Sequence, residues 1–126
     1  MKAAVLQTFR KDGSPLVTPV WFRERDGAYE VVIAEGDVKL AHLRRDPRCI
    51  FVAFDTEPPF AGLAITGEAE LVECDVTPIR AEIASRYLGA AGGARFAEQR
   101  RSKSGVLVSL TGERREWDLS NLLQET

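Results

Sequence analysis

The sequence is poor in the side chains that most often build metal sites and disulfide frameworks. Among 126 residues there are two cysteines and one histidine. Cys49 and Cys74 both lie in strand-like apolar stretches with no third or fourth ligand nearby, so we expect buried free thiols rather than zinc or a disulfide. This absence predicts a protein without a metal site, in a reduced cytoplasmic setting.

Long apolar runs and a dominant charge are also missing. No stretch approaches the roughly 20 apolar residues that a membrane helix needs, and no signal peptide is recognised. The formal net charge of -2 gives no general attraction to nucleic acid or to an anionic membrane. We therefore expect one soluble globular domain spanning residues 1–126, with neither of those partners.

Short β-branched and alternating segments separated by turns predict a mainly β domain with some helix. The Asp-Gly pairs that end at Gly13 and Gly27 are typical of turns, and they should join the first three strands into a meander. About six strands with two or three helices inserted between them indicate a closed or nearly closed antiparallel barrel. The expected strands are residues 3–10, 16–23, 28–34, 49–55, 63–74 and 105–111.

Helical spacing appears in three segments between these strands, and a proline or glycine ends the first two. Gly92 and Gly93 indicate a flexible connection between the last two helices. After the final strand, residues 112–117 should turn the chain into a polar tail at 118–126. The expected helices are residues 38–46, ended by Pro47, residues 77–88, ended by Gly89, and the basic segment 94–104.

The strongest functional signal lies where the strand at 28–34 gives way to the helix at 38–46. Asp37 can cap this helix by accepting a hydrogen bond from a backbone N–H two or three residues further on. The helix then presents unpaired N–H groups and a positive dipole end, which suit a phosphate. Lys39 lies in the first turn and His42 follows on the same face. The arrangement predicts an anion site, although a single lysine on a short helix is more often only solvated.

Four segments of the chain, taken in order and spacing, carry a resemblance to a known family. They are DGSPLVTPVWF at 12–22, AEGDVKLAHLRRDPR at 34–48, ITGEAELVE at 65–73 and REWDLS at 115–120. Together they resemble the pyridoxamine-phosphate-oxidase-like split-barrel family, and most closely its branch that uses flavin or the deazaflavin coenzyme F420. The resemblance extends over nearly the whole chain.

The resemblance implies an FMN-binding type of split β-barrel that forms a homodimer, with one cofactor in each of two grooves at the subunit interface. The strand that contains Thr18, Pro19, Val20 and Trp21 would lie along the isoalloxazine or deazaflavin ring. Its backbone groups would bond the pyrimidine edge of that ring. Lys39 would bind the cofactor phosphate, in agreement with the helix-terminus argument.

The same resemblance assigns roles to residues outside that strand. Arg44 would add to the phosphate site, and Trp117 would lie near the partner's ring or at the interface. Two residues depart from the family pattern. Ala34 stands where the family often has threonine or serine, which removes a hydroxyl donor to phosphate. His42 stands where the family usually has asparagine, and phosphate contact is one of its possible roles.

Two basic runs allow two interpretations each. The arginines at 44, 45 and 48 either form a solvated face or attract the acidic oligoglutamate tail of F420, which FMN lacks. The run at 100–103 allows the same alternatives, and there the solvated face is favoured.

Trp21 and its neighbour Phe22 should point to opposite faces of their strand, so one is expected in the core and the other exposed or at an interface. A small barrel with an exposed aromatic residue on an edge strand would hide that surface against a second copy. An exposed aromatic residue of this kind therefore also predicts a homodimer.

No nucleophile motif or glycine-rich phosphate loop is present, and the catalytic side chain is unknown. A redox enzyme whose cofactor carries the chemistry needs mainly positioning and electrostatics from the protein. We therefore predict an oxidoreductase that uses reduced F420, or alternatively FMN, to transfer hydride to a small unsaturated or carbonyl substrate. The alternative is a carrier that binds a flavin, a deazaflavin or haem without turnover, with His42 as the histidine available to haem. A barrel that kept its dimer and lost its ligand is a third possibility.

Overall fold

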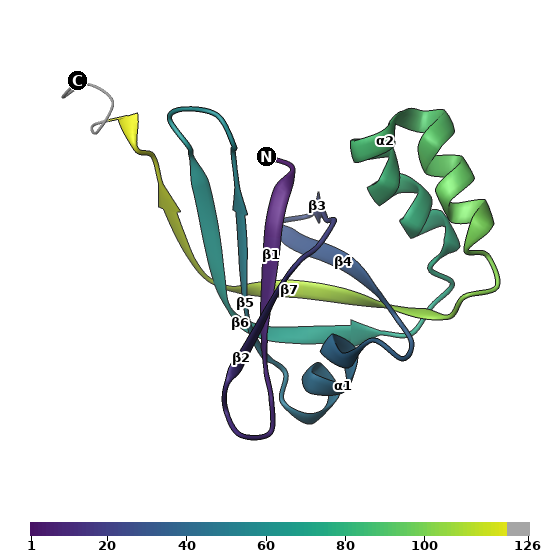
Figure 1. Ribbon diagram of the computed structural model, residues 1–126, viewed down its shortest axis with the longest axis horizontal. Coiled ribbons are helices and arrows are strands. Elements are labelled where there is room, and N and C mark those ends of the chain that lie inside the picture. Colours follow the sequence, from purple (N-terminus) through teal and green to yellow (C-terminus); the bar gives the residue numbers. More distant parts are fainter. Residues whose placement is uncertain (121–126) are drawn as a thin grey trace.

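One antiparallel sheet holds the seven strands of residues 1–120, the part of the chain that this computed structural model describes (Figure 1). Within the sheet the strands are ordered β2-β1-β5-β6-β7-β4-β3. The elements in chain order are β1 (Ala3–Phe9), β2 (Pro15–Pro19), β3 (Arg23–Arg25), β4 (Ala28–Ala34), α1 (Val38–Arg45), β5 (Arg48–Phe54), β6 (Gly62–Val72), α2 (Thr77–Gln99) and β7 (Gly105–Trp117).

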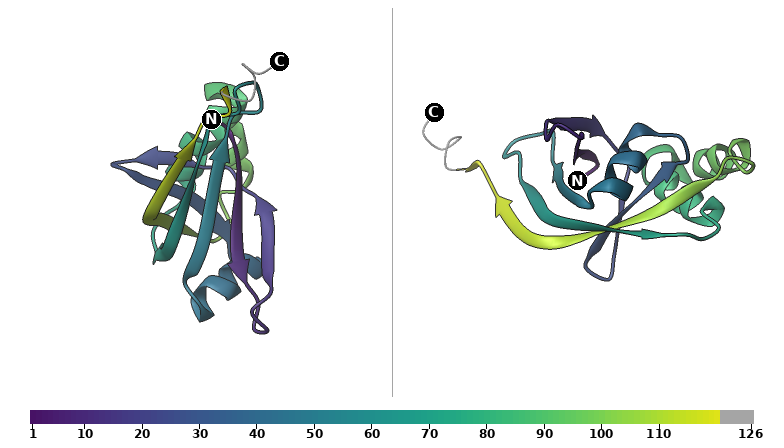
Figure 2. Two further views of the ribbon diagram at one scale, coloured as in Figure 1. Left: turned by 90° about the vertical axis from the view of Figure 1, so that its left-hand side faces the viewer. Right: turned by 90° about the horizontal axis from the view of Figure 1, so that it is seen from below.

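The two longest strands, β6 and β7, hold the two halves of the sheet together. They pair along all of β6, and Gly67 lies opposite Gly112 in this ladder. A Cβ atom on Gly67 would lie 2.3 Å from the carbonyl oxygen of Thr111, so no larger residue fits without a backbone shift. Both strands curve strongly (Figure 2), and glycine permits this close approach of the two backbones.

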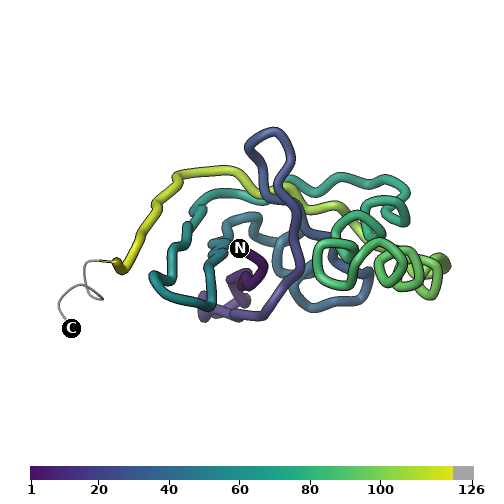
Figure 3. The backbone as a smooth tube through the Cα atoms, turned by 90° about the horizontal axis from the view of Figure 1, so that it is seen from above, coloured from purple at the N-terminus to yellow at the C-terminus, as the bar shows by residue number. Residues whose placement is uncertain are grey.

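The predicted meander of the first three strands is wrong. β2 pairs with β1, whereas β4 pairs with β3 and β7. Between them residues 20–22 cross from one edge of the sheet to the other (Figure 3). The cause is Phe22, which is buried in the core against Tyr29 and Phe51. Because β2 and β3 are the two edge strands, this link draws the edges together and curls the sheet toward a barrel.

Residues 112–117 were predicted to turn the chain, but they are the second half of β7 and pair with Gly62–Gly67 of β6. Residues 112–116 are exposed, and Trp117 is half-buried. Alternation of apolar and polar residues appears only where one face of a strand is buried. The segment therefore lacked the usual sequence signal of a strand.

The predicted flexible connection at Gly92 and Gly93 is also wrong. Both glycines are helical, and the break in α2 lies at Gly89, where φ is 78°. The two halves of α2 then fold back against one another (Figure 1). A Cβ atom on Gly93 would lie 2.2 Å from the Ser85 hydroxyl oxygen, so this glycine permits close packing of the two halves.

The two cysteines are free, but only one of them is buried. Cys49 lies in β5 with 4% exposure, whereas Cys74 is exposed because β6 ends at Val72 and leaves it in a loop. Burial raises the pKa of the Cys49 thiol to about 11. Residues 1–120 contain no group of three or more histidine, cysteine or acidic residues that could hold a metal ion. Neither helix in this part of the chain has the length and hydropathy needed to cross a membrane.

Candidate functional site

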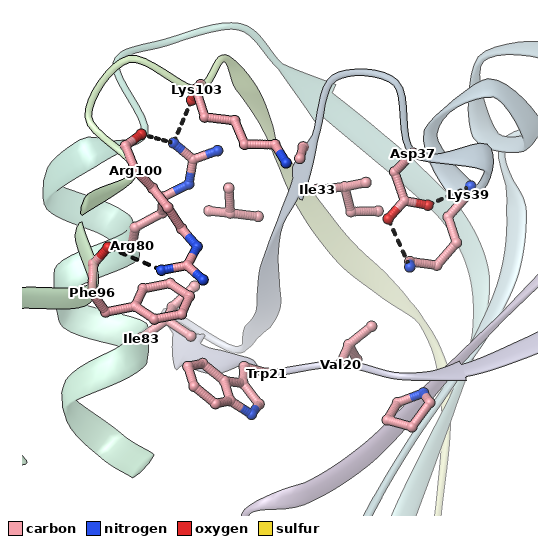
Figure 4. A pocket seen from close by; sticks show the side chains of 13 residues that line it. Val20, Trp21, Ile33, Asp37, Lys39, Arg80, Ile83, Phe96, Arg100 and Lys103 are labelled. Carbon is pink, nitrogen blue, oxygen red and sulfur yellow. Dashed lines mark hydrogen bonds and ion pairs between the residues drawn. The ribbon is translucent and has the colours of Figure 1, made fainter. Parts of the chain in front are cut away.

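A cleft of about 370 Å³ lies between α2 and the β4–α1 side of the sheet (Figure 4). Its size is within the range of about 300–1,000 Å³ that ligand pockets usually have. The link after β2, the end of β4, the first turn of α1, both halves of α2 and the turn after α2 supply its walls. The cleft thus collects residues that lie far apart in the sequence.

One end of the cleft is formed by the start of α1. Asp37 caps this helix as predicted, because its Oδ1 accepts a hydrogen bond from the Lys39 N–H at 2.9 Å. The Lys39 Nζ atom lies 3.0 Å from the other carboxylate oxygen, and the Lys39 side chain is only 15% exposed. Burial by itself raises the pKa of Asp37, but the hydrogen bonds and charge of Lys39 outweigh it and hold this pKa below its usual value. Asp37 therefore carries its negative charge at neutral pH.

The other end is formed by three cations, of which Arg80 is the most buried at 6% exposure. Its guanidinium donates to the carbonyl oxygens of Arg100, Lys103 and Ser104 at 3.2, 2.5 and 3.5 Å. Burial, followed by the charge of Arg100, lowers the pKa of Arg80. In residues 1–120 no carboxylate forms an ion pair with Arg80, Arg100 or Lys103.

An aromatic wall lies on the α2 side of the cleft (Figure 4). Trp21 stacks on Tyr87 with ring centroids 4.8 Å apart and an interplanar angle of 11°, and it also contacts Phe96 at 5.1 Å. Trp21 is 39% exposed and Phe22 only 3%, which confirms that these neighbours point to opposite sides. Val20, Ile33 and Ile83 complete an apolar surface beside this wall.

The structure brings five of the predicted site residues together. The lining of the cleft includes Pro19, Val20, Trp21, Ala34 and Lys39. These residues belong to the predicted strand at 16–23, to the end of the predicted strand at 28–34 and to the predicted helix terminus that follows it. The ligand contacts assigned to them stay predictions.

The other four predicted residues do not line this cleft. His42 is 6% exposed, and its Nδ1 lies 2.9 Å from the Thr8 hydroxyl. Thr18 lies in β2 with a buried hydroxyl oxygen that has no hydrogen-bond partner in residues 1–120. Arg44 makes a two-bond ion pair with the Glu35 carboxylate, at 2.7 and 2.9 Å.

Trp117 lies at the end of β7, where its Nε1 donates to the Phe60 carbonyl at 3.1 Å. Its ring lies so close to Gly62 that a Cβ atom there would be 2.4 Å from Trp117 Cζ2. The role assigned to Trp117, contact with a partner's ring, stays a prediction.

Four cleft residues that carry a charge or an aromatic ring were not among the predicted site residues. Arg80 lies on the buried side of α2, three and four residues before the buried Ile83 and Ala84, and an arginine on that face was a usable signal. Arg100 and Lys103 lie in the basic run at 100–103, for which a solvated face was favoured, and Phe96 precedes that run. The missed residues are Arg80, Phe96, Arg100 and Lys103.

Comparisons with known proteins show which family model and which solved structures the chain resembles. A family model described as pyridoxamine 5'-phosphate oxidase matches residues 1–117, and the comparison with curated proteins found no match. Among solved structures, a conserved hypothetical protein from Mycobacterium tuberculosis is 28% identical with a TM-score of 0.80, covering 97% of this chain and 80% of the other.

Two more distant structures share the fold. A protein named F420 reductase is 19% identical with a TM-score of 0.72, covering 90% of this chain and 89% of the other. A pyridoxamine 5'-phosphate oxidase-related, FMN binding protein from Nostoc punctiforme is 14% identical with a TM-score of 0.67, covering 94% and 75%. Together with the family model, these likenesses confirm the predicted split-barrel fold, which here has seven strands and two helices in residues 1–120.

Proposed function

The chain belongs to the pyridoxamine 5'-phosphate oxidase-like split-barrel family, and from that premise we propose that it is an oxidoreductase. It holds reduced F420, or alternatively FMN, in the cleft and transfers hydride to a small unsaturated or carbonyl substrate. The names of two structural relatives, an F420 reductase and an FMN binding protein, support a cofactor of this kind. Family membership by itself is equally compatible with a carrier, so the proposal depends on the cleft.

The observation that carries the proposal is the combination, in one cleft, of Lys39 at a helix N-terminus with an aromatic wall. F420 and FMN each carry a phosphate and a flat ring system. Cations and backbone N–H groups at a helix start suit the first, and an apolar and aromatic surface suits the second. The donor set of the cleft therefore fits the cofactor class.

Each part of the cleft has a distinct task in this proposal. Lys39 and the first turn of α1 bind the phosphate, while Asp37 holds the lysine side chain in place. Trp21 and Phe96 cover the apolar part of the cleft and exclude water, which hydride transfer requires. The Val20 N–H is already donated to the Ala4 carbonyl at 3.1 Å, so other backbone groups of this link must meet the ring. The cofactor, when bound, supplies the hydride, and the substrate takes up the hydride and a proton from solvent.

We further propose that the protein acts as a homodimer. Trp21 at the cleft, Val17 on the edge strand β2 and Val38 at the start of α1 are 39%, 51% and 56% exposed. Exposed apolar residues favour a covering partner, and Val17 is such a residue on an edge strand. A second copy of this chain would bury them and enclose the cleft, as the family resemblance implies.

A carrier without turnover is the second candidate. Its support is that the ionisable groups lining the cleft within residues 1–120 are arginines, lysines and the hydrogen-bonded Asp37, with no histidine, glutamate, cysteine or tyrosine among them. Haem binding through His42 receives no support, because this side chain is buried and bonded to Thr8.

Turnover of reduced cofactor separates the two candidates. Reduced F420 and reduced FMN are mixed anaerobically with the protein and a panel of small enones, aldehydes and ketones, and cofactor reoxidation is followed by absorbance. We expect enzyme-dependent reoxidation that Lys39→Ala lowers at least about tenfold in kcat/KM, since a hydrogen bond to a charged group contributes about 1.5–3 kcal/mol. Lys11→Ala, in the exposed β1–β2 turn, is the matched control and should leave the rate unchanged.

Two results would contradict the proposed activity. Equal rates in the wild-type protein and Lys39→Ala would remove Lys39 from the site. Tight binding of a cofactor that no acceptor reoxidises would favour the carrier.

A further inference from the structure

We propose that the α2 end of the cleft is a second anion site, in which Arg100 and Lys103 bind a carboxylate or phosphate group of the ligand and Arg80 positions them. The proposal rests on the proposed function in one respect only. It assumes that the cofactor phosphate is bound at the opposite end, by Lys39.

Arg80 stabilises this end of the cleft because its buried guanidinium donates hydrogen bonds to carbonyl groups of the turn that follows α2. It donates to the carbonyl oxygens of Arg100 and Lys103, at 3.2 and 2.5 Å, although these residues lie 20 and 23 positions further along the chain. The turn is also closed by a hydrogen bond from the Lys103 N–H to the Arg100 carbonyl at 2.9 Å. The backbone that carries both cations is therefore fixed by a side chain rather than by the helix alone.

Charge compensation distinguishes this cluster from the other arginines of the molecule. Arg101, in the same turn, is 68% exposed and pairs with Glu98 at 2.6 Å. Arg80, Arg100 and Lys103 have no such carboxylate within residues 1–120. Cations gathered in a partly enclosed cleft raise the local concentration of anions. A ligand anion would supply the missing negative charge.

The geometry favours an anion that presents two adjacent oxygens. The guanidinium of Arg100 stacks over the Phe96 ring at 3.7 Å, which limits its orientations. A guanidinium held in this way presents a fork of N–H donors that matches carboxylate or phosphate oxygens. The Lys103 side chain extends into the cleft from the same turn (Figure 4).

The two ends of the cleft are separated by apolar residues. Figure 4 shows Arg100 and Lys103 on the α2 side and Lys39 on the α1 side, with Ile33 between them. Asp37 is the carboxylate that lines the cleft, and it is held by Lys39. A ligand set with one anion at each end and an apolar middle fits this distribution of charge.

The second anion has two possible sources with the same chemistry. It is either the acidic tail of F420, in which case these cations select F420 over FMN, or an acidic group of the substrate. In the second case the substrate class narrows to unsaturated or carbonyl compounds that carry a carboxylate or phosphate.

The test compares the double variant Arg100→Gln/Lys103→Gln with the control Arg101→Gln, which removes a charge from the same turn outside the cleft. Dissociation constants are measured for F420, for FMN and for inorganic pyrophosphate as a probe anion. We expect the double variant to weaken the binding of F420, of pyrophosphate or of both about tenfold, while the dissociation constant of FMN changes by less than about twofold. Arg101→Gln should leave all three dissociation constants unchanged.

The individual arms identify the source. Weakening of F420 but not FMN assigns the anion to the cofactor tail, and weakening of pyrophosphate alone assigns it to the substrate. Equal weakening of F420 and FMN would overturn the proposal, because their shared phosphate would then lie at the α2 end. The proposal would also be overturned if the double variant left all three dissociation constants unchanged. It would be overturned as well if the wild-type protein bound neither pyrophosphate nor F420. If neither cofactor binds but pyrophosphate still distinguishes the variants, the proposed redox function fails and the anion site stands.

Arg80 is tested as a positioning residue with Arg80→Lys, which keeps the charge but cannot reach three carbonyl groups. We expect the same weakening of F420 or pyrophosphate as in the double variant, with FMN affinity unchanged. A general loss of folding would weaken FMN as well, and in that event the double variant still decides the proposal.

Discussion

Lys39 Nζ lies 3.0 Å from Asp37 Oδ2, so the cation expected to meet a ligand phosphate is already paired with the residue that caps its own helix. The carboxylate therefore has two opposing effects on an anionic ligand. It holds the lysine side chain beside the first turn of α1, and it also repels negative charge. This relationship makes Asp37 the residue through which affinity for the cofactor can be raised.

Asp37→Asn should tighten the binding of F420 and FMN several-fold at neutral pH. Asparagine caps a helix about as well as aspartate, so the helix start is kept while the repelling charge is removed and Lys39 is released. The measurement is a fluorescence titration of each cofactor, with Asp12→Asn in the exposed β1–β2 turn as the control. Weaker binding in Asp37→Asn would mean that the ion pair orients Lys39 rather than competes with the ligand.

Stability should fall as the pH drops from about 4 to about 2. Hydrogen bonds from the Arg48 side chain and backbone hold the pKa of Asp46 at about 2, against about 3.9 in an unfolded chain. Because this pKa is lower in the folded state, the ionised carboxylate stabilises the folded protein at pH values above the unfolded-state pKa. That stabilisation is lost as the pH falls through the folded-state pKa. The free energy of unfolding, measured with urea between pH 2 and pH 6, tests this prediction. Asp46→Asn should make that free energy less dependent on pH. A wild-type curve that is as flat as that of the variant would contradict the account.

The two thiols should react very differently. Burial raises the pKa of Cys49 to about 11, and only the thiolate is nucleophilic, whereas Cys74 is exposed. At pH 8 a chromogenic disulfide reagent should label one thiol of the native protein quickly and the second only after unfolding. Cys74→Ser should abolish the fast phase, and two fast thiols in the native protein would contradict the burial of Cys49.

The two tryptophans should report on the cofactor unequally. Trp21 lines the cleft, whereas Trp117 lies at the end of β7 and donates to the Phe60 carbonyl. Quenching of tryptophan fluorescence by F420 or FMN should persist in Trp117→Phe and be largely lost in Trp21→Phe. The reverse result would place the ring beside Trp117, as expected if a partner subunit contributes that residue to the site.

What the sequence predicted correctly depends on neighbours along the chain. The cap at Asp37, the position of Lys39 in the first helical turn and the opposite orientations of Trp21 and Phe22 all follow from local backbone geometry. The order and spacing of four short segments added the family resemblance, which the match over residues 1–117 confirms.

What it missed depends on contacts between distant parts of the chain. Because Phe22 is buried, the chain crosses the barrel and β2 does not pair with β4. No local sequence pattern indicates that β2 pairs with β1 and β4 with β7. Arg80 acquires its partners from residues 20 or more positions away. The basic run looked like a solvated face because sequence alone cannot tell Arg101, which is paired with Glu98, from Arg100, which lines the cleft.

We propose that the cleft beside Lys39 binds a phosphate-bearing flavin or deazaflavin. Equilibrium fluorescence titration of the wild-type protein, Lys39→Ala and Lys11→Ala with F420 and with FMN tests it most directly. We expect micromolar or tighter binding of at least one cofactor, weakened about tenfold or more by Lys39→Ala and unchanged by Lys11→Ala. Binding of neither cofactor, or equal affinity in the wild-type protein and Lys39→Ala, would contradict it.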